Sequence, residues 1–251
     1  MVSSMLAYTN DKPYTTYTGE TLQCNLMEGK DVNDVLKMVK QDWYELSYPA
    51  PYEGWVLTPT LYADNDGGYD LFWAGFTTNN ADMGTTLDWF YENGTKVFDK
   101  WQNLVSCASW SHWEIFEARR PTNTLVEGDT GYWAFHSCNF KDGKSVSDLR
   151  ANDIEWNEFL DSIGHDGGVW RWWAGGGSDT QNSTDYYVNI SFSTMNEYGK
   201  YRDARMNAMM NGSMPEQIAD CAAPRVYSAN NIKAITTCLL YTSDAADEHT
   251  G

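Results

Sequence analysis

The stretch LQCNLMEGKDVNDVL, residues 22–36, decides the fold because the chain repeats it as HSCNFKDGKSVSDLR, residues 136–150. When Cys24 is aligned with Cys138, six of the eleven positions that begin at this cysteine are identical. Two unrelated segments of average composition would share roughly one such position. We therefore predict that the chain contains an internal duplication.

The repeat divides the chain into segments. Its period is far longer than the repeat unit of a solenoid, so each copy is expected to form a small domain. The polar segment RRPTNTLVEGDTG between the copies has the turn residues of a linker. We expect a disordered or truncated N-terminus at 1–17, a first repeat at 18–119, a linker at 120–130, a second repeat at 131–234 and a non-native tail at 235–251.

Each copy is predicted to have the element order βαββαβ. In the first copy, alternating apolar residues indicate strands at 20–27, 54–63, 69–76 and 111–118, although Pro59 favours an edge position for the second strand. Apolar residues at helical spacing follow Asp31 and recur within 81–105. This order is typical of a ferredoxin-like α+β unit, in which helices cover one face of a four-stranded antiparallel sheet.

The two copies together resemble the dimeric α+β barrel superfamily, fused in tandem so that one chain forms its own pseudo-dimer. The phrase C-N-[LF]-x-[ED]-G-K also resembles secreted proteins of marine bacteria. The resemblance implies two ferredoxin-like repeats that form one α+β barrel, and a monomer with internal pseudo-twofold symmetry. It implies no particular reaction.

Four cysteines occupy matching positions in the two copies. The first and last strands of a ferredoxin-like unit are neighbours, so Cys24 can reach Cys107 and Cys138 can reach Cys221. We predict these two disulfides, which favour a periplasmic or secreted protein. The alternatives are buried free thiols in the cytosol, or catalytic or metal-binding thiols. No CxxC motif or zinc-type Cys–His spacing occurs, so no metal site is predicted.

The composition excludes some partners. The formal net charge of −18 disfavours nucleic acid and anionic membrane surfaces. No apolar run approaches the ~20 residues that span a bilayer. The 12 Trp and 16 Tyr residues fill a core or line a pocket for a small apolar or aromatic molecule.

Strand alternation suggests a site between the two sheets. In the first copy we assign Phe72, Ala74 and Phe76 to the helix side of the third strand, which leaves Trp73 on the open face. His112 and Glu114 are then candidate catalytic residues in the barrel. The candidate ligand-binding residues are Asn25, Trp73, Asn139, Arg171, Tyr187 and Asn189.

The superfamily resemblance also bears on cofactors. Its cofactor-free monooxygenases and its haem-degrading enzymes use Asn and Trp in this cavity, and the haem enzymes add a His from the second helix. The corresponding segments here, 81–105 and 195–219, contain no His, so no cofactor is predicted. Phosphate-loop, dinucleotide-binding, GxSxG and HExxH motifs are absent as well.

Three functions remain open. The preferred one is an exported protein that binds a small apolar or aromatic ligand between its two sheets. The second is a cofactor-independent monooxygenase or isomerase, with His112 as acid or base. The third is a structural or interaction module with a fully packed interior.

The segment CLLYTSDAADE, residues 238–248, resembles one reading frame of a widely used sequencing adapter. We predict that deletion of residues 238–251 leaves the melting temperature unchanged in thermal denaturation, because a non-native tail has no packing to lose. A loss above about 1 kcal/mol, the scale of a typical destabilising substitution, would instead identify the tail as native structure.

Overall fold

A computed structural model describes residues 14–63, 68–123, 128–178 and 183–233. The expectations for the N-terminal residues before Tyr14 and for the tail lie outside these described residues.

The first half of the chain contains four strands and the helices between them. In order these are β1 (Thr15–Leu26), α1 (Val32–Met38), the π-helical turn η1 (Val39–Trp43), β2 (Glu53–Leu61), β3 (Leu71–Thr77), α2 (Asn80–Asn93), α3 (Thr95–Gln102) and β4 (Val105–Arg119).

The second half contains five strands and two helices in its described part. In order these are β5 (Thr130–Phe140), α4 (Val146–Ser162), β6 (Val169–Ala174), β7 (Tyr186–Phe192), α5 (Met195–Asn211), β8 (Ala219–Cys221) and β9 (Arg225–Lys233).

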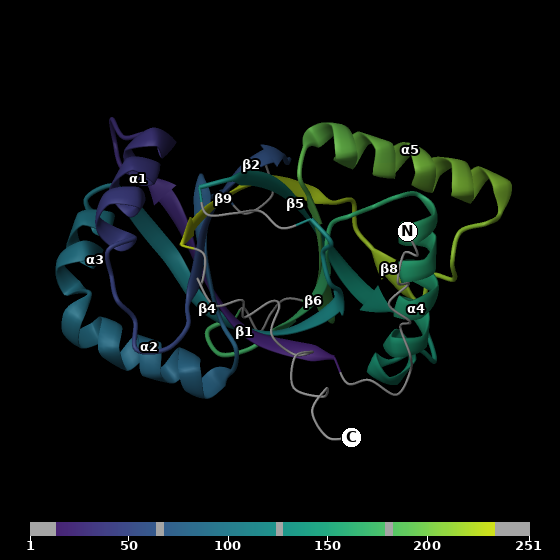
Figure 1. Cartoon of the computed structure of the whole chain (residues 1–251), viewed down its shortest axis with the longest axis horizontal. Helices are drawn as coiled ribbons and strands as arrows, with labels where there is room; N and C mark the ends of the chain where they lie inside the picture. Colours follow the sequence, from purple (N-terminus) through teal and green to yellow (C-terminus); the bar gives the residue numbers. More distant parts are fainter. Residues whose placement is uncertain (1–13, 64–67, 124–127, 179–182, 234–251) are drawn as a thin grey trace, which may run out of the picture.

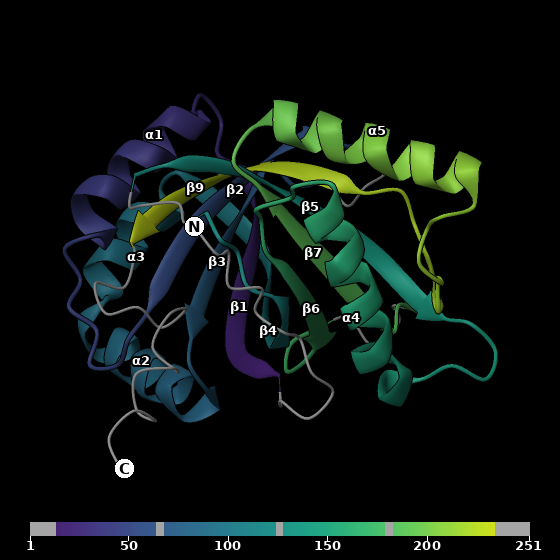
Figure 2. The same cartoon turned by 45° about the vertical axis from the view of Figure 1, so that its right-hand side comes forward.

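Eight strands form a closed antiparallel barrel. The order is β7-β6-β4-β1-β3-β2-β9-β5, and the pairing of β5 with β7 closes the ring. Within the halves the orders are β4-β1-β3-β2 and β9-β5-β7-β6, and the halves meet where β4 pairs with β6 and β2 with β9. Figure 1 looks along the barrel, with α1, α2 and α3 on one side and α4 and α5 on the other, and Figure 2 shows the same two groups from a second direction. The chain thus has the α+β barrel that the sequence predicted.

Both repeated phrases start helices as predicted. Asp31 caps α1 by accepting a hydrogen bond from the backbone N–H of Asp34, whose carboxylate accepts one from the N–H of Asp31. At the start of α4 the N–H of Ser145 donates to the carboxylate of Asp148 over 2.8 Å.

Both predicted disulfides are present. Cys24 is bonded to Cys107, and Cys138 to Cys221. Each pair lies directly across two neighbouring antiparallel strands, β1 with β4 and β5 with β8. Cys107 lies within β4 rather than before it, since this strand begins at Val105.

Aromatic rings pack together inside the barrel. Ring centroids lie 4.8 Å apart for Trp55 and Trp133, and 5.0 Å apart for Phe72 and Tyr227. Strands from both halves contribute to this buried cluster, which we call the barrel cluster. Its ring-bearing buried members are Tyr17, Trp55, Phe72, Trp133, Trp172 and Tyr227.

The prediction for the faces of β3 was wrong. Phe72 and Ala74 belong to the barrel cluster, whereas Trp73 lies in the core beneath the helices of the first half. The register explains the error: Leu22 belongs to the core beneath these helices, and Trp73 pairs with it across β1 and β3. Directly paired residues share a face of the sheet, so Trp73 must face the helices too.

Pro59 also lies elsewhere than predicted. Its strand, β2, is not an edge strand, because it pairs with β3 on one side and with β9 on the other. Pro59 lies opposite Tyr227, next to an irregularity in the β2–β9 register, where a missing backbone donor is tolerated.

We predict that Trp73→Ala lowers the free energy of unfolding by about 3–5 kcal/mol, because it opens a cavity in a packed core. Trp73 is 1% exposed and contacts the rings of Trp43 and Trp101. Urea denaturation measures the loss, and Tyr62→Ala, at a position 64% exposed, should change stability by less than about 0.5 kcal/mol. A loss below about 1 kcal/mol for Trp73→Ala would contradict this packing role.

Candidate functional site

The predicted site residues of the first repeat do not meet inside the barrel. Asn25 is exposed near the end of β1, and Trp73 is buried under the helices. His112 pairs with Glu20, which belongs to the helix side of the sheet because it bonds Tyr52 there. Glu114 lies on the same face of β4 as His112, is exposed, and accepts a hydrogen bond from Asn80 at the start of α2, with an N–O distance of 3.0 Å. The proposed acid–base pair therefore lies outside the barrel.

The predicted residues of the second repeat are divided among three places. Tyr187 and Asn189 lie on the barrel side of β7, as predicted, and Asn189 is 1% exposed. Asn139 is exposed and accepts a hydrogen bond from the N–H of Asp185. Arg171 is buried on the opposite side of the sheet, toward α4.

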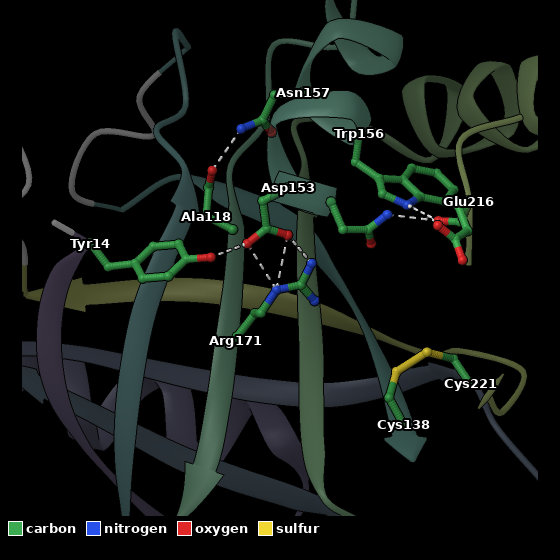
Figure 3. A network of polar contacts seen from close by, with 10 residues as sticks. Tyr14, Ala118, Cys138, Asp153, Trp156, Asn157, Arg171, Glu216 and Cys221 are labelled. Carbon is green, nitrogen blue, oxygen red and sulfur yellow. Dashed lines mark hydrogen bonds and ion pairs between the residues drawn. A yellow bond between two sulfur atoms is a disulfide. The ribbon is translucent and has the colours of Figure 1, made fainter. Parts of the chain in front are cut away.

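Arg171 belongs to a polar cavity in the second half. The cavity has a volume of about 90 Å³ and lies between the outer face of strands β5, β6 and β7 and the helices α4 and α5. Its polar and aromatic lining includes His136, Asp153, Trp156, Arg171, Tyr201 and Arg205. Figure 3 shows part of this network and its position beside the disulfide of the second half.

A row of three residues forms the floor of the cavity. His136 on β5 pairs with Val188 on β7, and Val188 pairs with Arg171 on β6. Neighbouring strands are about 4.8 Å apart, so the backbones of His136 and Arg171 are about 10 Å apart. An apolar side chain thus separates a histidine from a guanidinium on one surface.

Asp153 holds Arg171 in place. The carboxylate of Asp153, on α4, accepts hydrogen bonds from Nε of Arg171 at 3.0 and 3.2 Å and from Nη2, and it also accepts one from the hydroxyl of Tyr14 at 2.6 Å (Figure 3). Burial acts to lower the pKa of Arg171, but the Asp153 carboxylate more than offsets this and raises it. Arg171 therefore stays charged although it is buried.

His136 is neutral and has a defined tautomer. Its Nδ1 lies 2.9 Å from the carbonyl oxygen of Ala222, which can only accept, so Nδ1 carries the proton. Burial lowers the pKa of His136 to about 4, and the nearby charges of Arg205 and Arg202 act in the same direction. Nε2 of His136 is left as a lone-pair acceptor without a hydrogen-bond partner among the described residues.

The helices supply the opposite wall. The guanidinium of Arg205, on α5, lies 5.6 Å from the ring centroid of Trp156, on α4. The segment after α5 is tied to α4, because the carbonyl of Glu216 accepts hydrogen bonds from Asn152 at 2.8 Å and Trp156 at 3.3 Å. The wall is thus built from two helices and the returning chain.

In the first half the corresponding space over Leu22 and Trp73 is filled. Under α1, α2 and α3 the indole rings of Trp43, Trp73 and Trp101 contact one another, with centroids 4.6 to 6.1 Å apart. A polar group is buried there too, since Glu20 accepts hydrogen bonds from Tyr52 at 2.5 Å and Trp110 at 2.6 Å. The cavity beside Glu20 measures only about 10 Å³.

Sequence reasoning missed His136, Asp153 and Arg205, although two signals were available. His136 aligns with Leu22 in the repeated phrase, so an apolar position of the first copy is a histidine in the second. Asp153 lies between Leu149 and Leu160 at helical spacing, on the face where apolar residues are expected. Charged or titratable groups at core positions were the indication of this site.

No metal centre emerges from the described part of the chain, where no group of three or more His, Cys, Asp or Glu side chains is arranged to hold an ion. Nor is any helix within those residues long and apolar enough to cross a membrane.

Comparison with known proteins supports the fold. No family model and no curated protein sequence matches the chain. Among solved structures, a "Putative monooxygenase" of Fusobacterium nucleatum aligns over 88% of this chain and 94% of its own, with a TM-score of 0.52 at 7% identity. A chlorite dismutase of Candidatus Nitrospira defluvii (87% and 92% covered, TM-score 0.48, 9% identity) and an anthrone oxidase-like protein (88% and 94%, 0.44, 12%) are also similar. At the level of fold, the chain is therefore similar to proteins of the dimeric α+β barrel type.

The buried His136 makes stability depend on pH. Its pKa is about 4 in the folded chain and about 6.5 in the unfolded chain, so the unfolded state binds an extra proton between these values. We predict that the stability of the parent relative to His136→Gln is highest above pH 6.5 and falls by roughly 3 kcal/mol as the pH is lowered to 4. Urea denaturation across this range measures the difference.

His165, whose pKa is also lowered to about 4 by burial, is unchanged in both proteins and cancels from the comparison. A stability difference that stays constant with pH would show that His136 is not held neutral.

Proposed function

We propose that this chain is a small-molecule-binding protein whose ligand lies in the cavity between the second-half sheet and helices α4 and α5. One observation carries the proposal. The two halves pair their strands in the same order, yet indole rings fill the space over Leu22 and Trp73 in the first half, whereas the corresponding row of the second half, His136 and Val188, borders an open cavity. Because the first half shows that the architecture can be packed here, the cavity is not a requirement of the fold.

The chemistry of the lining suits a ligand that has an apolar body and a few polar groups. Val188, Leu160 and Ile218 offer apolar surface, and His136 and Arg205 offer one acceptor and one cation at separate points. Mostly apolar walls with a small number of placed polar groups are typical of small-molecule sites.

This proposal moves the ligand away from the space between the two sheets. That space contains the barrel cluster, whose rings are in contact, so the polar cavity is the better supported position. A small apolar or aromatic ligand remains the expected class.

We also propose that the halves are ferredoxin-like repeats that arose by duplication and that the protein is exported. The common strand order and the repeated phrase support the duplication. The two disulfides support export, because such bonds persist in oxidising compartments.

An enzyme is the second candidate. The unprotonated Nε2 of His136 can take a proton from a bound molecule, and the guanidinium of Arg171 lies across Val188 from it, where it can stabilise negative charge. This combination supports a cofactor-independent oxygenase or isomerase. The Fusobacterium structure is named as a monooxygenase, which agrees with the oxygenase. Turnover of a bound ligand that is lost in His136→Gln, with binding retained, would select the enzyme.

The binding proposal is tested by filling the cavity. We predict that Val188→Phe weakens binding of small single-ring aromatics at least tenfold, because the added ring occupies the floor between His136 and Arg171. Ligand-observed NMR with benzoate and benzyl alcohol measures the binding. Val146→Phe, at a position 52% exposed on α4, makes the same size change away from the cavity and should leave binding unaltered. Equal binding by the parent and Val188→Phe would show that the ligand lies elsewhere.

A further inference from the structure

We infer that the cavity selects an anion, specifically a single-ring aromatic acid whose carboxylate binds at Arg205. This inference rests on the proposed binding function and specifies its ligand class.

The local charge of the cavity is opposite to that of the protein. The whole chain has a formal net charge of −18. The ionised side chains that line the cavity are Arg171, Arg205 and Asp153, two cations and one anion, so the lining carries a net charge of +1. His136 adds no charge, since it is neutral. An acidic protein thus presents a positive interior surface at one place, where it attracts anions that its exterior repels.

Arg205 is the cation that remains available. Among the described residues Arg205 forms no ion pair with a carboxylate, and its contacts are the ring of Trp156 and the side chain of Tyr201. Burial raises the pKa of Tyr201, while the neighbouring Arg205 acts to lower it, so this phenol is no carboxylate substitute. The Arg205 guanidinium lies over the indole of Trp156, and a guanidinium can bind a planar carboxylate through two parallel N–H groups.

Arg171 has a different role because Asp153 neutralises it. Both carboxylate oxygens of Asp153 accept from Arg171, and the hydroxyl of Tyr14 completes the group. The carboxylate of Glu216, which is next to the lining residue Gln217, lies 2.9 Å from Lys144. Arg205 is therefore the only cation of the lining without a carboxylate partner in the described residues.

His136 limits the rest of the ligand. Its Nε2 is an acceptor, so a hydroxyl group can donate to it, whereas a second carboxylate would meet a lone pair. The cavity is open, and its volume of about 90 Å³ is smaller than the ~150 Å³ of an engineered cavity that accommodates one benzene, so only part of a single ring can be enclosed and the rest must lie at the mouth. A benzoate or hydroxybenzoate, with its ring toward Val188 and its carboxylate toward α5, satisfies these constraints.

The experiment measures dissociation constants of benzoate, 4-hydroxybenzoate, benzyl alcohol and benzylamine by calorimetry at one pH and low salt. The parent should bind benzoate at least tenfold more tightly than benzyl alcohol, and benzylamine most weakly. Arg205→Gln should remove the preference for benzoate while binding benzyl alcohol within about twofold of the parent. The matched control Arg202→Gln, at an exposed position on the same helix, should keep the preference.

The outcomes separate the two proposals. If benzyl alcohol binds as tightly as benzoate in the parent, or if Arg205→Gln keeps the preference, anion selection is wrong and the binding function stands. If Arg202→Gln loses the preference to the same extent as Arg205→Gln, the effect comes from the charge of α5 in general, and the carboxylate site at Arg205 is wrong. If none of the four compounds binds to the folded parent, both proposals fail.

Discussion

The strands of the barrel are buried on both faces, and the rest of the structure depends on this constraint. Once β4 pairs with β6 and β2 with β9, the eight strands enclose an interior, and the helices of each half cover the outside. Each strand must then supply apolar side chains to both faces. The interior is filled by large rings from both halves, which accounts for part of the chain's surplus of Trp and Tyr.

The same architecture leads to different outcomes in the two halves. Under the first group of helices, three indole rings occupy the space over Trp73 and leave a cavity of only about 10 Å³ beside Glu20, although a separate pocket of about 430 Å³ lies between α3 and β4. Under the second group, Arg171 and Asp153 occupy buried positions. A buried ion pair seldom stabilises a fold more than apolar residues of the same volume would. The second half thus has a charged pair beside an open space where the first half has packed rings.

The disulfide of the second half connects stability to this site. Cys221 lies in the short strand β8 and lines the cavity, and the carbonyl of the next residue, Ala222, accepts a hydrogen bond from Nδ1 of His136. The bond to Cys138 holds this segment against β5, so the covalent framework also determines which nitrogen of His136 is protonated. The corresponding bond in the first half closes a region of packed core around Cys24.

The sequence by itself determined the alternation of strands and helices, the helix caps and the pairing of cysteines, because each depends on contacts local in sequence or on one repeated offset. It did not determine which face of β3 meets the helices. The alternation of side chains sorts the residues of a strand into two faces, but it does not say which face points toward the helices, and both faces of β3 carry aromatic residues. That assignment came from the register of Trp73 against Leu22, a long-range pairing. Only the tertiary structure brought His136, Arg171 and Arg205 to one cavity. They lie on three different elements, and their meeting depends on how α4 and α5 pack over the sheet.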